Sequence, residues 1–175
     1  ELADADYKFI GETDQDWAGY QITNAGDVDG DGLGDILIGA DGDDGGVQAH
    51  ASYLFLAVSL DSYPTIDLSK ADYKFIGEES YDYASQVSTA GDVDGDGLDD
   101  ILIGAAGSDH GGSSSGAAYV VLASSLCDDE VVDLADADYI LTGENPGDYA
   151  GATVANAGDI DGDGLGDIMV GALDY

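Results

Sequence analysis

The chain has almost no positive charge. Its 175 residues include 38 acidic side chains but only three lysines and no arginine, so the formal net charge is −35. This balance argues against nucleic acid as a partner and disfavours anionic membranes, because both require clustered cationic side chains. Two interpretations stay open: a halophilic surface, on which high salt screens the repulsion, or an acidic face for a cationic partner. The acids are spread along the whole chain, which favours the first.

Cysteine and long apolar runs are scarce as well. With Cys127 as the only cysteine, no intrachain disulfide can form. No apolar run reaches the length of a membrane span, so we expect no membrane insertion. The two histidines, His50 and His110, occupy non-equivalent positions, and no nucleophile stands beside a base. The sequence therefore predicts a protein that is not an enzyme.

One acidic nine-residue string occurs three times, at 27–35, 92–100 and 159–167. Its first copy reads Asp-Val-Asp-Gly-Asp-Gly-Leu-Gly-Asp. Carboxylates stand at positions 1, 3, 5 and 9, and glycines at positions 4 and 6 let the backbone turn tightly around one point. An all-oxygen cage of this kind suits Ca²⁺, whereas Mg²⁺ demands a stricter octahedron, and zinc and copper prefer imidazole or thiolate.

We therefore predict three calcium sites, each with four carboxylates and the main-chain carbonyl of the leucine at position 7. The predicted ligands are Asp27, Asp29, Asp31, Leu33 and Asp35 in the first loop, Asp92, Asp94, Asp96, Leu98 and Asp100 in the second, and Asp159, Asp161, Asp163, Leu165 and Asp167 in the third. The simpler alternative is an acidic hairpin turn without metal. Three copies with the same spacing disfavour it.

The segments that follow the loops exclude a helical calcium motif. Residues 36–40, 101–105 and 168–172 are short apolar runs that end in Gly-Ala, which is typical of buried strands. EF-hand and dockerin-like loops instead open into helices.

A longer repeat surrounds these loops, with Tyr7, Tyr73 and Tyr139 each 66 residues apart. Its second copy predicts four strands, at 86–90, 101–105, 117–122 and 139–142. Four strands per repeat are typical of a propeller blade. We expect residues 1–175 to be a segment of one β-propeller domain, with repeats at about 7–72, 73–138 and 139–175, the last incomplete. The stretches 59–70 and 125–138 align without gaps and are expected to be ordered connections.

Ala25-Gly26-Asp27, the acidic loop and then Gly39-Ala40 resemble the FG-GAP repeat of integrin alpha-chain propellers and many secreted bacterial proteins. The resemblance implies an all-β partial propeller of about three repeats with four-stranded antiparallel blades. It also implies calcium between the first two strands of each blade. The Phe-Gly of the family is replaced by an aromatic beside small residues. These aromatics, expected to pack between blades rather than stack on sugars, are Trp17, Tyr83 and Tyr149.

The resemblance implies a calcium-binding structural or adhesion module of a secreted or cell-surface protein. Its partners would be an extracellular protein or glycan, or neighbouring copies of the chain. Two alternatives stay open: a non-catalytic propeller attached to a polysaccharide-active extracellular enzyme, and a subunit of an extracellular filament. The strand count does not close a ring, so we expect an excerpt of a longer propeller.

Overall fold

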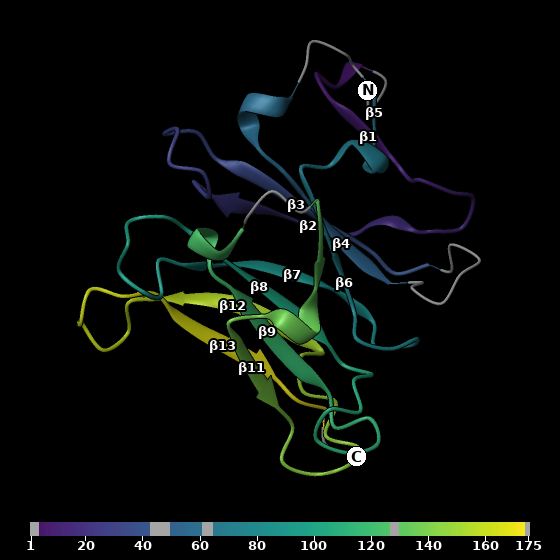
Figure 1. The fold of residues 1–175 in the computed structure, drawn as a ribbon, viewed down its shortest axis with the longest axis vertical. Helices are drawn as coiled ribbons and strands as arrows, with labels where there is room; N and C mark the ends of the chain where they lie inside the picture. Colours follow the sequence, from purple (N-terminus) through teal and green to yellow (C-terminus); the bar gives the residue numbers. More distant parts are fainter. Residues whose placement is uncertain (1–3, 43–49, 61–64, 127–129, 174–175) are drawn as a thin grey trace.

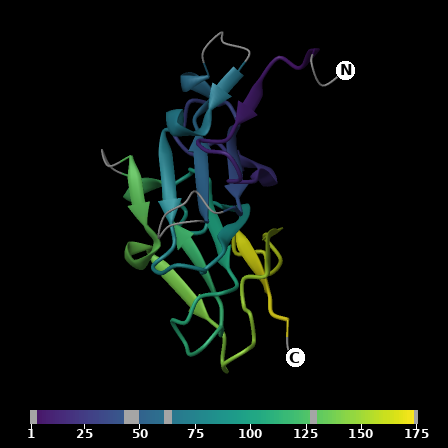
Figure 2. The same cartoon turned by 90° about the vertical axis from the view of Figure 1, so that its right-hand side faces the viewer.

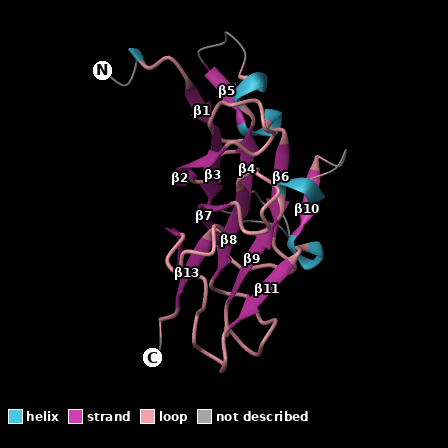
Figure 3. Cartoon of the chain, turned by 90° about the vertical axis from the view of Figure 1, so that its left-hand side faces the viewer, coloured by secondary structure: helices cyan, strands magenta, loops and turns pink. Residues whose placement is uncertain are grey.

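The computed structural model describes residues 4–42, 50–60, 65–126 and 130–173, so Cys127 lies outside the described residues. Within these ranges the secondary structure consists of β-strands and short 3-10 turns, without an α-helix (Figures 1 and 3). The fold is all-β, as predicted, and its sheets are arranged as propeller blades.

Two large sheets form the centre of the molecule. The first has the strand order β10-β6-β4-β3-β2, and the second has the order β11-β9-β8-β7. The strands of the first sheet are β2 (Ala18–Gly26), β3 (Asp35–Ala40), β4 (Ala51–Phe55), β6 (Tyr73–Ile76) and β10 (Val131–Asp133). Those of the second are β7 (Ala84–Gly91), β8 (Asp100–Ala105), β9 (Ala117–Val121) and β11 (Tyr139–Thr142). The four strands predicted for the second copy are all present.

Two smaller sheets flank them. Strands β12 (Thr153–Gly158) and β13 (Asp167–Gly171) pair antiparallel and begin a third blade. Strands β1 (Lys8–Ile10) and β5 (Thr65–Asp67) pair in parallel. The sheets follow one another along the long axis of the molecule, with the amino-terminal strands at one end (Figure 2).

The strands that open each blade are neighbours but belong to different sheets. Strand β2 is the edge of the first large sheet, β7 is the edge of the second, and β12 pairs with β13. Hydrogen bonds between these opening strands involve single side chains: Gln21 Nε2 donates to the Val87 carbonyl at 2.8 Å, and Asn156 N–H donates to Ser88 Oγ at 3.2 Å. This arrangement confirms separate blades rather than a continuous solenoid sheet.

The connections between the last two strands of a repeat reach back to the preceding blade. Val131–Asp133 adds to β6 in parallel, with Val132 opposite Phe75, and Thr65–Asp67 adds to β1 in the same way. A 3-10 turn follows each added strand, η3 (Leu68–Lys70) and η5 (Leu134–Asp136). The first leucine of each turn is fully buried. The sequence did not predict this fifth, parallel strand. Of the connections expected to be ordered, residues 61–64 and 127–129 lie outside the described residues.

The central blade is buried on both faces, which explains its continuous apolar strands. Ile101 and Ile103 of β8 pack in one cluster with Leu37 and Phe75 of the first blade. Leu102 points the other way and packs in a second cluster with residues of β12 and β13. Because successive side chains of β8 point to opposite faces, this one strand contributes to both of its interfaces with neighbouring blades. Such an interface between two blades is called a seam below.

Glycine at the end of β8 lets the next blade approach closely. A Cβ on Gly104 would overlap the carbonyl oxygen of Gly151 and lie 3.0 Å from Val154 Cγ1. Gly39 of the first blade has the same relation to the Ser85 carbonyl. The glycine of the Gly-Ala pair therefore has a packing role in the first two blades.

Gly104→Ala is expected to lower the free energy of unfolding by about 1–3 kcal/mol, because the added methyl group meets backbone that cannot rotate away. Urea unfolding followed by circular dichroism measures the change. Gly34→Ala is the control, since its nearest neighbour is the flexible Asn24 side chain. Equal stabilities of the two variants would contradict close packing at this seam.

Candidate metal centre

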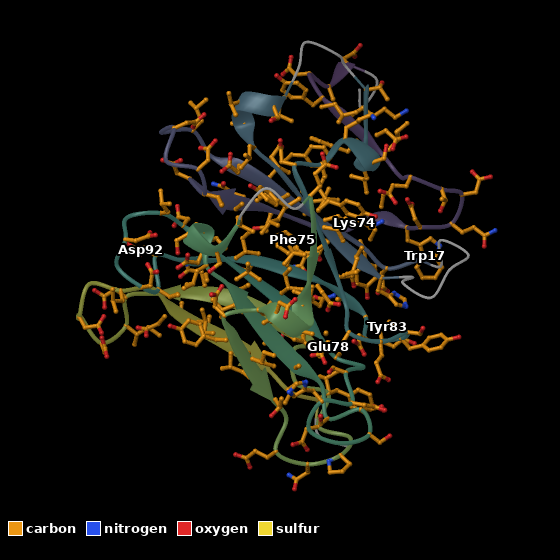
Figure 4. All side chains as sticks on the ribbon, in the orientation of Figure 1. Trp17, Lys74, Phe75, Glu78, Tyr83 and Asp92 are labelled. Carbon is orange, nitrogen blue, oxygen red and sulfur yellow. The ribbon has the colours of Figure 1, made fainter. Side chains whose placement is uncertain are left out.

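The three acidic loops connect the first two strands of each blade, β2 to β3, β7 to β8 and β12 to β13. Figure 4 shows Asp92 on the side of the molecule opposite Trp17 and Tyr83. The glycines at positions 4 and 6 have positive φ in every loop, for example 77° at Gly30 and 87° at Gly32. Only glycine adopts this region freely, so the repeated Gly positions are explained by the tight turns.

Each loop gathers three carboxylates. Within each group the possible ligand oxygens lie within 4.8 Å of one another. The groups are Asp27, Asp29 and Asp35 in the first loop, Asp92, Asp94 and Asp96 in the second, and Asp159, Asp161 and Asp167 in the third. The other predicted carboxylates, Asp31, Asp100 and Asp163, are not members of these groups. Positions 1 and 3 thus converge in all three loops, and the third member varies.

Hydrogen bonds to the backbone hold the carboxylates in place. In the first loop, Gly32 N–H donates to Asp27 Oδ2 at 3.0 Å, and Asp31 N–H donates to Asp29 Oδ1 at 3.0 Å. Leu33 N–H donates to Asp31 Oδ1 at 2.7 Å, and Leu98 and Leu165 make the equivalent bonds. These bonds fix the leucines at position 7, whose carbonyls remain predicted ligands.

The aspartate at position 9 is buried in the first two loops. Asp100 is fully buried, and its two oxygens accept hydrogen bonds from Val93 N–H at 2.8 Å and Ala123 N–H at 2.9 Å. Asp35 makes the matching bonds to Val28 and Ala57 at 2.8 Å each. Burial raises the pKa of both carboxyls, and the two backbone donors oppose that shift. Each oxygen keeps a further lone pair for a second partner.

One buried carboxylate oxygen tests whether the loop residues fit a cation. Asp27 Oδ1 is buried and has no hydrogen-bond partner within the described part of the chain. Leaving a buried charged oxygen unpaired is unfavourable, and a cation at the centre of the group would satisfy it. The donor set is entirely oxygen, so the residues present fit a hard divalent cation.

The aromatic residues opposite the metal loops only partly match expectation. Trp17, Tyr83 and Tyr149 all have positive φ, near 50–57°. The Tyr83 ring packs on the His50 ring of the first blade, with centroids 4.4 Å apart, as interblade packing predicts. Trp17 differs, since 64% of its surface is exposed. The backbone conformation does not account for this difference, because all three aromatics share it.

A polar network beneath this face was missed from the sequence. Asp82 is buried and accepts a hydrogen bond from Glu79 N–H at 2.8 Å, and Asp16 and Asp148 recur at the same place in the repeat. Beside it, the Tyr119 hydroxyl donates to Glu78 Oε1 at 2.9 Å, and His110 Nδ1 lies 3.1 Å from the same oxygen. The recurrence of Asp at an interval of 66 was the available signal.

Asp82→Asn is expected to reveal a pH dependence of stability. Burial raises the pKa of Asp82, and the nearby Glu78 and Glu79 charges add to the effect. A raised pKa means that the folded state favours the protonated carboxyl. The stability that this proton contributes is complete below the ordinary aspartate pKa and is lost as pH rises through the pKa of the folded state. The free energy of unfolding of the wild type should therefore rise relative to that of Asp82→Asn as pH falls from about 7 to about 4.

Urea unfolding at intervals across that range measures the difference. The exposed Asp14→Asn substitution is the control, and its difference from wild type should stay flat. A wild-type advantage that grows with rising pH would contradict the assignment.

Separate antiparallel sheets around shared seams, each with an acidic loop after its first strand, define a β-propeller repeat protein. Residues 18–55 and 83–121 match the FG-GAP repeat. The chain is 35% identical to integrin alpha-5 of Xenopus laevis over 105 residues, 57% of this chain and 9% of that protein. It is 28% identical to integrin alpha-PS2 of Drosophila melanogaster over 164 residues, 91% of this chain and 11% of that protein. The chain therefore contains two matches to the FG-GAP repeat and is similar to integrin alpha chains over most of its length.

The matched region is a small part of these relatives, since the chain spans about a tenth of their length. The described part of the chain contains no helix with the length and apolar character that crossing a membrane requires.

Proposed function

We propose that the chain is a calcium-binding structural and adhesion module, in which Ca²⁺ in each of the three loops rigidifies the blades. The ligands would be the four aspartates and the leucine carbonyl of each loop. The buried, unpartnered Asp27 Oδ1 is the observation that carries the proposal. In this proposal residues 1–175 form a segment of one propeller domain, with repeats at about 7–72, 73–138 and 139–175.

Rigidity follows from the electrostatics of the loops. Carboxylate oxygens within 4.8 Å of one another repel when no cation is present. Without a cation the loops would open or take up protons, so folding and cation binding are linked. Calcium outside cells is present at millimolar concentration, which suits sites of weak to moderate affinity. This supports an extracellular or cell-surface location.

The adhesive part of the proposal is supported by the integrin alpha relatives. A rigid blade can present its loops to an extracellular protein or glycan, or to a neighbouring copy, without an ordering cost at each encounter. The net charge of −35 disfavours polyanionic partners.

Equilibrium dialysis against ⁴⁵Ca²⁺ tests the metal sites directly. We expect three ions per chain, and two in the Asp94→Asn, Asp96→Asn double variant, which keeps the loop shape but removes two charges. Fewer than one ion per chain at about 10 mM calcium would contradict the proposal. Binding to a glycan array in calcium but not in EDTA would support the adhesive role, whereas binding that EDTA leaves unchanged would separate adhesion from the metal.

A further inference from the structure

The acidic loops of neighbouring blades are hydrogen-bonded to each other. Asp99 N–H donates to the Asp27 carbonyl at 3.0 Å, and Asp27 N–H donates back to Asp99 Oδ2 at 2.9 Å. At the next seam Gly166 N–H donates to the Asp92 carbonyl at 2.7 Å. In both cases position 8 of one loop holds position 1 of the preceding loop.

An apolar contact accompanies each of these bonds. The side chain of Leu98 lies over Gly30, where an added Cβ would meet Leu98 Cδ2 at 3.0 Å. Leu165 covers Gly95 in the same way, at 3.1 Å. The leucine at position 7 thus packs on the glycine at position 4 of the loop before it, so the three loops form a continuous stack.

We propose that these contacts couple the three cation sites, so that occupancy of one loop raises the affinity of its neighbour, with Asp99 as the positioning residue at the first seam. The inference rests on the proposed function, because it requires the loops to bind cations. Asp99 lies between two proposed ligands, Leu98 and Asp100. A cation in the second loop therefore fixes the backbone that holds Asp27, the first ligand of the preceding loop.

The coupling is favourable because ordering is shared. A loop that its neighbour already holds in place loses less conformational freedom when it binds its own cation. The effect is reciprocal, so each site gains from the other by the same factor.

The two seams differ in strength. Position 8 is Gly34 in the first loop, Asp99 in the second and Gly166 in the third. At this position only the first seam adds a side-chain bond to the backbone bond. Gly26 makes room for it, since a Cβ there would overlap the Asp99 carboxylate. The first and second sites are therefore coupled more tightly than the second and third.

Calcium titration followed by amide NMR tests the coupling site by site. The glycine N–H at position 6 donates to the position 1 carboxylate in each loop, so Gly32, Gly97 and Gly164 report on the three sites separately. About 1 M NaCl reduces the screening length to about 3 Å and suppresses long-range charge effects.

Asp99→Gly places at this position the residue that the other two loops already have. We expect it to raise the calcium midpoint at Gly32 by about fivefold or more, and to leave Gly164 within about twofold. Asp99→Asn keeps an acceptor oxygen for Asp27 N–H and should behave like wild type. The exposed Asp14→Asn substitution controls for the loss of one charge.

Emptying the second loop gives an independent measurement. The Asp94→Asn, Asp96→Asn double variant should raise the midpoints at both Gly32 and Gly164. Leu98→Ala tests the apolar contact and should raise the calcium midpoint reported by Gly32. This variant replaces Asp99→Gly as the test if Asp99→Gly does not fold. Unchanged Gly32 midpoints in the folded variants would overturn the coupling. If calcium does not shift the amide resonances of Gly32, Gly97 and Gly164 in the wild-type chain, the metal sites themselves are refuted.

Discussion

Excess EDTA is expected to lower the midpoint of thermal unfolding by roughly 15–30 °C relative to the chain in about 10 mM calcium. A site with a Kd of about 10⁻⁴ M then stabilises the native state by roughly 2.7 kcal/mol, if the unfolded chain does not bind. Three such sites supply on the order of 8 kcal/mol, comparable to the stability of an ordinary domain. Coupling between the loops would make their loss more cooperative.

Differential scanning calorimetry with and without EDTA measures this shift, at a fixed high concentration of NaCl so that screening stays constant. Magnesium at the same concentration is the control, and it should restore less of the midpoint because it demands a stricter coordination geometry. An unchanged midpoint would mean that the loops are acidic turns, and calcium-dependent rigidity would be excluded.

Asp100→Ala is expected to lower the free energy of unfolding by about 2–4 kcal/mol even in EDTA. The carboxylate bonds Val93 N–H in its own loop and Ala123 N–H at the start of the 3-10 turn η4 (Ala123–Ser125). Its removal leaves two donors without their acceptor, at about 1–3 kcal/mol for each donor that is buried. Relief of the desolvated charge offsets part of that loss.

Asp96→Ala is the matched control, because Asp96 belongs to the same loop but is exposed. In EDTA it should change stability by about 0.5 kcal/mol or less. Urea unfolding of both variants separates the two roles of the loop. If Asp100→Ala is as stable as Asp96→Ala in EDTA, then position 9 has no structural function apart from the metal.

Local signals in the sequence predicted much of this molecule. The Asp and Gly spacing of each acidic string is set by the turn it must make, so the positive φ of Gly30 and Gly32 follows from the string itself. The apolar runs after the loops are long enough to mark the strands β3, β8 and β13. A period of 66 residues then predicted separate blades.

What the sequence did not predict depends on contacts between repeats. Val131–Asp133 has only three residues, too few for a periodic pattern, and its pairing with β6 is set by where the chain returns in space. The bond between Asp99 and Asp27 spans 72 residues and has no local signature. The second role of Asp100, as a tie between loop and connection, is likewise visible only once Ala123 is placed beside it.

The strand β10 changes what counts as a unit of this protein. The sequence repeat ends before Tyr73 or Tyr139, yet the sheet of the first repeat is completed by Val131–Asp133 of the second. The buried Leu134 that follows packs in the cluster shared by both blades. A gene duplication that copied one repeat would therefore copy a piece that supplies an edge strand to its predecessor and depends on its successor for its own. A single repeat cut out and placed in another protein would therefore lack the edge strand that its successor supplies.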